Sequence, residues 1–227
     1  MFTKFKLKLK SFAERRFALS IAALALALVI VAGGCAKLSE VLKSKEENVS
    51  VKINSELNNL LSYRSEATVE YISNKGSNKY DTVQQCKSNG QYRIEVVGPD
   101  NVSGNITLSD GNTIYQYNTR INAKVSVAIK ENQERSEIFL TSFIKNYAAS
   151  ASVSAGSFSD GGCTVLEAKV PGTHPYLTTE KLWVDNATLA PVKLVIYDSD
   201  GNERVVVTYK TFEYNVPLDD NIFTYSM

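Results

Sequence analysis

The chain has one histidine, and its surroundings predict no catalytic role for it. His174 lies between Thr173 and Pro175, directly after a glycine, which is typical of a turn. A catalytic triad needs its histidine beside a nucleophile, and the sequence contains no G-x-S-x-G motif to supply one. We therefore expect His174 to be a turn residue without a role in catalysis.

The acidic residues do not form a pair suited to acid–base catalysis. Asp219 and Asp220 are adjacent, so their side chains diverge instead of flanking one bond as glycosidase carboxylates do. Glu70 and Glu95 occupy the polar positions of alternating segments, which indicates a solvated face. We predict no catalytic residue and no enzymatic activity.

Cofactor and metal sites are also not predicted. One histidine and two distant cysteines cannot supply the four ligands of structural zinc. The acidic run at 198–202 is too short for a calcium loop and fits a hairpin turn, and no G-x-x-x-x-G-K-[ST] phosphate loop occurs. The expected cofactor and metal content is none.

The N-terminus has the layout of an export signal. A basic run is followed by an apolar block at 17–32 and then by Gly33, Gly34 and Cys35. The block is shorter than the ~20 apolar residues that a membrane-spanning helix needs. A cysteine after small residues resembles a bacterial lipoprotein signal, in which that cysteine becomes the lipidated first residue, although Ala32 stands where leucine is usual.

We therefore predict a signal peptide at 1–34 and a lipid anchor, such as a palmitoylated one, at Cys35. The alternatives are an ordinary signal peptide or an uncleaved N-terminal anchor. All three place the protein outside the cytoplasm and close to a membrane.

Cleavage before Cys35 leaves 193 of the 227 residues, enough for one medium domain. Removal of the six basic residues and one glutamate of the leader changes the formal charge from +1 to −4. No basic surface is indicated, so we expect no nucleic-acid partner and no ionic attraction to an anionic membrane. Cys86 and Cys163 then form an even pair in an exported chain, which favours a disulfide, with two buried thiols as the alternative.

Beyond the leader, the pattern predicts a polar tether at 35–50 and one domain at 51–227. Apolar residues at helical spacing predict amphipathic helices over 51–61 and 132–146. Period-two alternation between Gly- and Asn-containing turns predicts about ten strands, whose ranges are 67–73, 79–87, 92–96, 104–109, 113–118, 123–129, 163–170, 179–185, 191–198 and 203–212. Residues 148–162 are small and polar and predict a loop or a weak strand.

The order of these elements resembles the LolA/LolB lipoprotein-carrier family. The resemblance is carried by Tyr92–Pro99, Leu108–Tyr117, Leu182–Asp185 and segments between Leu189 and Phe223. The resemblance covers most of the mature chain and implies a mainly β fold, an unclosed antiparallel β-barrel with covering helices. Among anchored members, the chain is similar to the clostridial spore germination lipoprotein GerS.

Two functions follow from the resemblance. One is a non-catalytic lipoprotein that binds and supports a spore-cortex peptidoglycan amidase, or another extracytoplasmic protein, in cortex modification and germination. The other is a carrier or receptor for lipids or lipoproteins. For the carrier we expect an apolar cavity lined by bulky side chains, which are Ile94, Val96, Ile106, Leu108, Ile114, Phe139 and Phe143. Because an open half-barrel has exposed edges, a homodimer by edge-strand pairing or swapping is also predicted.

Overall fold

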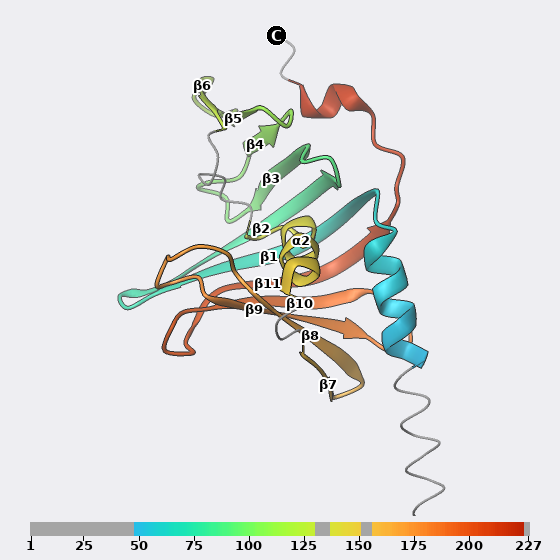
Figure 1. The fold of residues 1–227 in the computed structure, drawn as a ribbon. Coiled ribbons are helices and arrows are strands. Elements are labelled where there is room, and N and C mark those ends of the chain that lie inside the picture. The colour runs from blue at the N-terminus through green and yellow to red at the C-terminus, as the bar shows by residue number, and fades with distance from the viewer. Residues whose placement is uncertain (1–47, 130–136, 151–155, 225–227) are drawn as a thin grey trace, which may run out of the picture. The chain divides into compact units, whose positions relative to one another are not determined.

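The computed structural model describes residues 48–129, 137–150 and 156–224 (Figure 1). The chain divides into two units, Met1–Asn48 and Val49–Met227. The predicted signal peptide, Cys35 and most of the tether lie outside the described residues. Within the described ranges, no helix combines the length and apolar character needed to cross a membrane.

The second unit is built on one antiparallel sheet of eleven strands. The strands are β1 (Ser62–Ser73), β2 (Gly76–Lys87), β3 (Tyr92–Gly98), β4 (Asn105–Ser109), β5 (Thr113–Asn118), β6 (Ala123–Ala128), β7 (Gly156–Asp160), β8 (Cys163–Lys169), β9 (Thr179–Asp185), β10 (Pro191–Tyr197) and β11 (Glu203–Tyr214). Their spatial order is β6-β5-β4-β3-β2-β1-β11-β10-β9-β8-β7. As far as the described residues show, the two end strands do not pair with each other, so the predicted mainly β, unclosed antiparallel architecture is confirmed.

Two meanders join at the centre of this sheet. β1 to β6 follow one another in space as they do in sequence, and so do β7 to β11. The long strands β1 and β11 pair with each other and connect the two halves, with one irregularity in register between Glu66 and Ala67. The predicted loop or weak strand before residue 163 is a strand, β7, which pairs with β8 from Asp160↔Cys163 onward.

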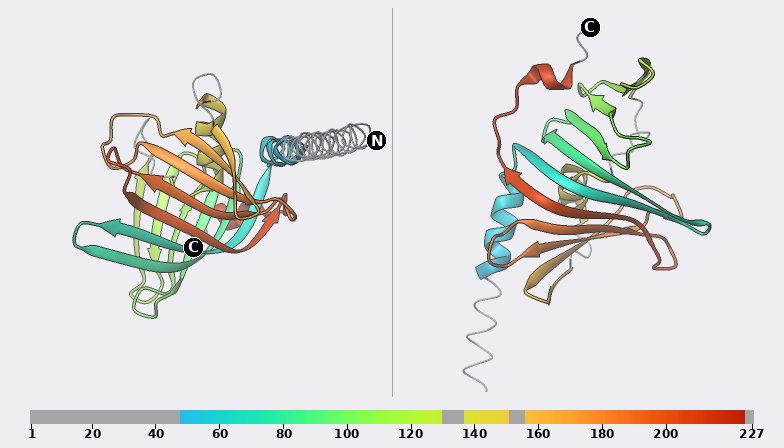
Figure 2. Two further views of the ribbon diagram at one scale, coloured as in Figure 1. Left: turned by 90° about the horizontal axis from the view of Figure 1, so that it is seen from below. Right: turned by 180° about the vertical axis from the view of Figure 1, so that it is seen from behind.

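The helices pack against one face and one end of the sheet (Figures 1 and 2). Residues 48–58 are helical and bury Ile53 and Leu57 in the core. The second helix, α2 (Leu140–Ser150), covers the other part of the core and begins later than residue 132. Residues 132–136 of the predicted helix lie outside the described residues.

The sheet has two distinct faces, set by the alternation along each strand. Cross-strand partners share a face, so the register places Tyr63 of β1 beside Cys86 of β2 and Tyr92 of β3. All three belong to the hydrophobic core that includes the side chains of α2. We call this side the α2 face and the opposite side the outer face.

Candidate functional site

The α2 face is the candidate site, and bulky side chains of α2 and of the turn before it pack into it. Phe139, Leu140 and Phe143 are almost completely buried, Phe143 with 0% of its surface exposed. The ring of Phe139 lies 4.5 Å from that of Tyr92 between centroids. The backbone N–H of Leu140 donates to the hydroxyl of Tyr63, at 3.3 Å. The start of α2 is therefore fixed to the sheet by apolar packing and a buried hydrogen bond.

The far end of α2 is fixed by polar contacts. The side-chain amide of Asn146 donates to Glu180 Oε1 of β9, at 2.9 Å, and the hydroxyl of Ser150 accepts from the backbone N–H of Lys169 on β8, at 3.1 Å. Glu180 is fully buried, with 0% exposure. Its burial raises the pKa of the carboxyl to about 7, and nearby Glu137 adds to the rise, while the bond from Asn146 opposes it. The carboxyl is therefore poised to change charge near neutral pH.

Four buried polar atoms lie without a hydrogen-bond partner in the described residues. They are Ser65 Oγ, Gln84 Nε2, Glu180 Oε2 and the Tyr209 hydroxyl. An unpaired buried polar atom costs roughly 1–3 kcal/mol, so this face combines bulky apolar packing with uncompensated polar groups. Burial also raises the pKa of Tyr209, which keeps its hydroxyl protonated.

The predicted cavity residues are divided between the two faces. Ile94 pairs with Gln84, which aligns with core-facing Ser65, so Ile94 lies on the α2 face together with Val96. Ile114 lies on the same side and packs against the core, and Phe139 and Phe143 are themselves core residues. Ile94, Val96 and Ile114 are only half-buried.

Ile106 and Leu108 do not lie on the α2 face, contrary to the sequence prediction. Ile106 pairs with Glu95 and Leu108 with Arg93, and both partners are outer-face residues of β3. Alternation correctly predicts which residues of one strand share a face. It does not predict which of the two faces of β4 is turned to α2, because that depends on the connection between β3 and β4. The predicted set of seven is therefore reduced to five on that face.

The C-terminal segment also packs against the sheet (Figure 2). Its short 3-10 helix, η1 (Asp220–Phe223), contacts β3 and buries Phe223 completely. Lys87 pairs with Asp220 and lies over the ring of Phe223, 5.1 Å from its centre. A C-terminal strap therefore packs along the sheet where β2 ends.

The disulfide predicted for Cys86 and Cys163 is not formed in the structure, where both are free. Cys86 is on β2 and Cys163 begins β8, five strand positions away. At about 4.8 Å per strand, they stand ~24 Å apart along the sheet, whereas bridged cysteines need Cα atoms within about 7 Å. Cys86 is instead a core residue, and burial raises the pKa of its thiol.

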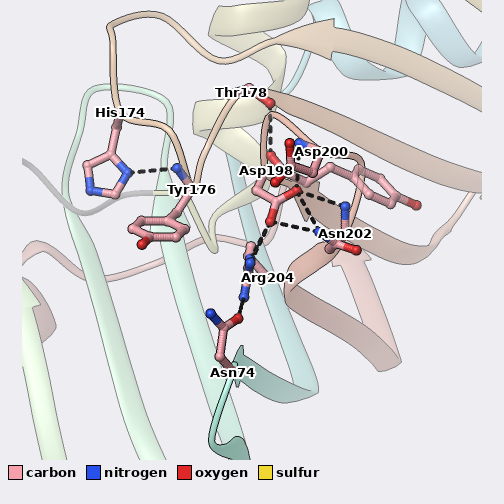
Figure 3. Close-up of polar contacts among 9 residues, drawn as sticks. Asn74, His174, Tyr176, Thr178, Asp198, Asp200, Asn202 and Arg204 are labelled. Atoms are coloured by element: carbon pink, nitrogen blue, oxygen red, sulfur yellow. Dashed lines mark hydrogen bonds and ion pairs between the residues drawn. The ribbon is translucent and has the colours of Figure 1, made fainter.

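His174 lies in a polar cluster at the end of the sheet, where three loops meet (Figure 3). Its Nδ1 accepts the backbone N–H of Tyr176 at 3.3 Å, as expected of a turn residue. Beside it, Arg204 donates to Asp198 from Nε at 2.7 Å and to Asn74 of the β1–β2 turn at 2.9 Å.

Asp198 is the anchor of this cluster. Its burial alone would raise the pKa, but hydrogen bonds from Asn202 and Arg204 outweigh this effect and hold the pKa at about 2. In this cluster the polar side chains form hydrogen bonds within and between turns, and these bonds join the ends of separate hairpins. Among the residues the structure describes, no group of three or more His, Cys, Asp or Glu is placed to hold a metal ion.

Sequence reasoning missed the polar members of the α2 face. One signal was present for Glu180, because in Thr179–Asp185 it shares alternation with Leu182 and Val184, both buried. A carboxylate in an apolar row predicts a buried acid. Nothing comparable marks Asn146 or Tyr63, since the residues that they contact come from distant parts of the chain.

Comparison with known proteins assigns the family. A family model described as "Sporulation protein YdcC-like" matches residues 18–223. The chain belongs to the YdcC-like sporulation protein family. No match was found among curated proteins.

Several solved structures resemble this YdcC-like chain. The GerS lipoprotein complex with the CwlD amidase, from Clostridioides difficile, gives 28% identity over 74% of this chain and 95% of the matched one, with a TM-score of 0.48. An uncharacterised conserved protein from Thermus thermophilus gives 12% identity, 78% and 94% coverage, and a TM-score of 0.47. A LolA superfamily protein from Nitrosomonas europaea gives 14% identity, 77% and 96% coverage, and a TM-score of 0.42. The family assignment rests on the family model.

Proposed function

We propose that this protein is a non-catalytic, membrane-anchored lipoprotein that binds and supports a spore-cortex peptidoglycan amidase. In this role it acts outside the cytoplasm, held at the membrane through Cys35. The amidase carries out the chemistry on cortex peptidoglycan, and the YdcC-like domain supplies a binding surface. Cortex modification and germination are the processes that depend on it.

The observation that carries this proposal is the family match over residues 18–223 to sporulation proteins. The match begins inside the predicted leader and reaches the C-terminal strap, so it includes the whole described sheet. It supports a role in sporulation for the folded domain.

The packing of the α2 face supports a scaffold over a carrier. A carrier keeps its apolar face open for an acyl chain, and ligand pockets are usually lined by apolar groups around a cavity. Here Phe139, Leu140 and Phe143 are buried against the sheet by contacts within the chain. With this face occupied by α2, a partner protein binds to the exposed strands and turns.

Co-purification tests the proposal. The full-length protein, tagged at the C-terminus, is extracted in mild detergent from sporulating cells, and the C35A variant serves as the matched control for anchoring. We expect a peptidoglycan amidase to co-purify with the anchored protein. Recovery of the protein without any amidase from cells that express one would contradict the proposal.

A second candidate, a carrier or receptor for lipids or lipoproteins, is favoured by one observation. Ile94, Val96 and Ile114 are only half-buried, and they extend the α2 face beyond the side chains of α2. Native mass spectrometry of the protein purified from membranes distinguishes the two candidates. A bound acyl ligand in stoichiometric amount supports the carrier, and a ligand-free mass supports the scaffold.

A further inference from the structure

Strand β6 forms one end of the sheet and is exposed along its length. In the described part of the chain it pairs with β5 alone. All six of its residues are exposed, and Val125 and Val127 each show 59% of their surface. Figure 1 shows β6 beyond β4 and β5, at the end of the sheet that α2 does not cover.

The direction of the backbone groups of β6 follows from one hydrogen bond. The N–H of Ile129 donates to the carbonyl of Asn112, at 2.8 Å, on the side of β5. In an antiparallel strand, the N–H and C=O groups of successive residues point alternately to the two sides. The register with β5 runs without a shift, so Val125 and Val127, like Ile129, direct their backbone N–H and C=O groups to β5. The backbone N–H and C=O groups of Ser126 and Ala128 therefore point to the open edge.

β6 has few of the features that usually protect an edge strand. Natural edges are blocked by proline, bulges or charged side chains. β6 contains no proline, and its pairing with β5 shows no bulge. Its one charged residue, Lys124, has its amino group 5.1 Å from the centre of the Tyr115 ring. The edge is therefore a template for one more strand.

The side chains of β6 specify what kind of strand fits. Val127 pairs with Ile114, and so the two valines stand on the α2 face. Ser126 stands on the outer face between them. A strand added here places every second side chain beside the valines, where apolar residues gain burial, and the others beside small or polar groups.

We propose that β6 is the docking edge for the partner, which adds an extended segment of alternating apolar and polar residues to the sheet. The partner's backbone bonds to Ser126 and Ala128, and its apolar side chains pack beside Val125 and Val127. This inference rests on the proposed function, because the partner is the amidase named there. To the proposed function it adds where on the fold the amidase binds, which is the β6 edge, and how it binds, which is by strand addition.

A proline at position 126 tests the edge without disturbing the pairing with β5. Ser126→Pro removes an N–H that points to the open edge, and edge strands tolerate proline at such positions. Ser126→Thr is the matched control, because it keeps the N–H and suits a strand. Circular dichroism and thermal unfolding of both full-length variants in detergent show whether each is folded. Binding is then measured with the purified cortex amidase of the same organism as the probe.

We expect Ser126→Pro to weaken amidase binding by about tenfold or more, since it leaves a partner carbonyl unpaired, and Ser126→Thr to bind like the wild type. Hydrogen exchange of the complex should show slowed exchange at the amides of Ser126 and Ala128. If the wild type does not bind the amidase, the proposed function fails, and this inference fails with it.

Two other results overturn only the docking edge. Equal binding by the wild type and a folded Ser126→Pro variant, without protection of the two amides, leaves the proposed function intact and removes β6 as its surface. A change in self-association alone, measured by sedimentation, assigns the edge to a second copy of this chain. That outcome matches the homodimer predicted from the sequence and contradicts docking of the amidase at β6.

Discussion

The side-chain amide of Asn146 on α2 donates a hydrogen bond to Glu180 on β9, at 2.9 Å, across the buried interface between helix and sheet. The other carboxylate oxygen has no partner among the described residues. This contact fixes the C-terminal part of α2 through a group whose pKa is raised to about 7 by burial. A buried group that contacts the C-terminal part of α2 therefore changes its charge near neutral pH.

Glu180 should make stability depend on pH between about 4.5 and 7. Its pKa is near 7 in the folded protein and close to the ordinary 4.5 in the unfolded chain, so the folded state holds more protons in this window. Its contribution is fully present below the unfolded pKa and is lost as the pH rises through the folded one. The loss is about 3 kcal/mol. Urea unfolding of the wild type and of Glu180→Gln across this range measures it.

Glu180→Gln is the control because glutamine keeps an acceptor for Asn146 and does not ionise. We expect the free energies of unfolding of the two proteins to be similar at about pH 4, with the variant more stable at about pH 8. Parallel pH profiles for the two proteins would show that Glu180 does not titrate in this window.

Phe143→Ala should strongly destabilise the domain. Phe143 has no exposed surface and packs against the core and the ring of Tyr147, whose centroid is 5.7 Å away. Removing a buried phenylalanine side chain costs roughly 3–5 kcal/mol. Lys145→Ala, two residues further on the exposed side of α2, should change stability by less than about 0.5 kcal/mol. A small effect of Phe143→Ala in urea unfolding would mean that α2 is not firmly packed on the sheet.

The sequence predicted the strands better than their relation to one another. Period-two alternation correctly located β3, β5 and β9 and told which residues share a face within each. It did not tell that Ile106 faces away from Ile94, because that depends on the chain geometry between β3 and β4. One residue of shift there exchanges the two faces of β4.

The order of the strands in the sheet was also not predicted from the sequence. The even cysteine count favoured a bridge, but β1 pairs with β11 at the centre, which places Cys86 and Cys163 in different halves of the sheet. The Asn146–Glu180 contact was hidden for the same reason, since it joins residues 34 positions apart that only the fold brings together. Local sequence patterns predict which residues share a face and where turns occur, whereas contacts between distant residues can be predicted only when the strand order is known.

The two cysteines should differ in reactivity. Burial raises the pKa of both thiols, but Cys86 is buried in the core, while Cys163 is half-exposed at the start of β8. In a folded Cys35→Ser variant, iodoacetamide should therefore alkylate Cys163 and spare Cys86, and unfolding should make Cys86 reactive. Peptide mass mapping without reduction checks this prediction. A peptide pair joined through Cys86 and Cys163 would restore the disulfide and contradict the structure.

Cys35 should be the lipidated first residue of the mature protein. Intact mass and N-terminal peptide analysis of protein extracted from membranes should show a chain that begins at Cys35 and carries acyl groups. Cys35→Ala should leave the protein unanchored or unprocessed, while the folded domain keeps its thermal unfolding profile. A mature chain with an unmodified Cys35 would remove the lipid anchor from the proposed function.

Amidase activity on purified spore-cortex peptidoglycan, with and without the full-length protein, tests the proposed role most directly. The amidase of the same organism is titrated with the wild type, and binding is followed in the same samples. We predict a stoichiometric complex and a higher rate of peptidoglycan cleavage than with the amidase alone, with no cleavage by the protein alone. No complex and an unchanged rate, with both proteins folded, would contradict the role as an amidase partner.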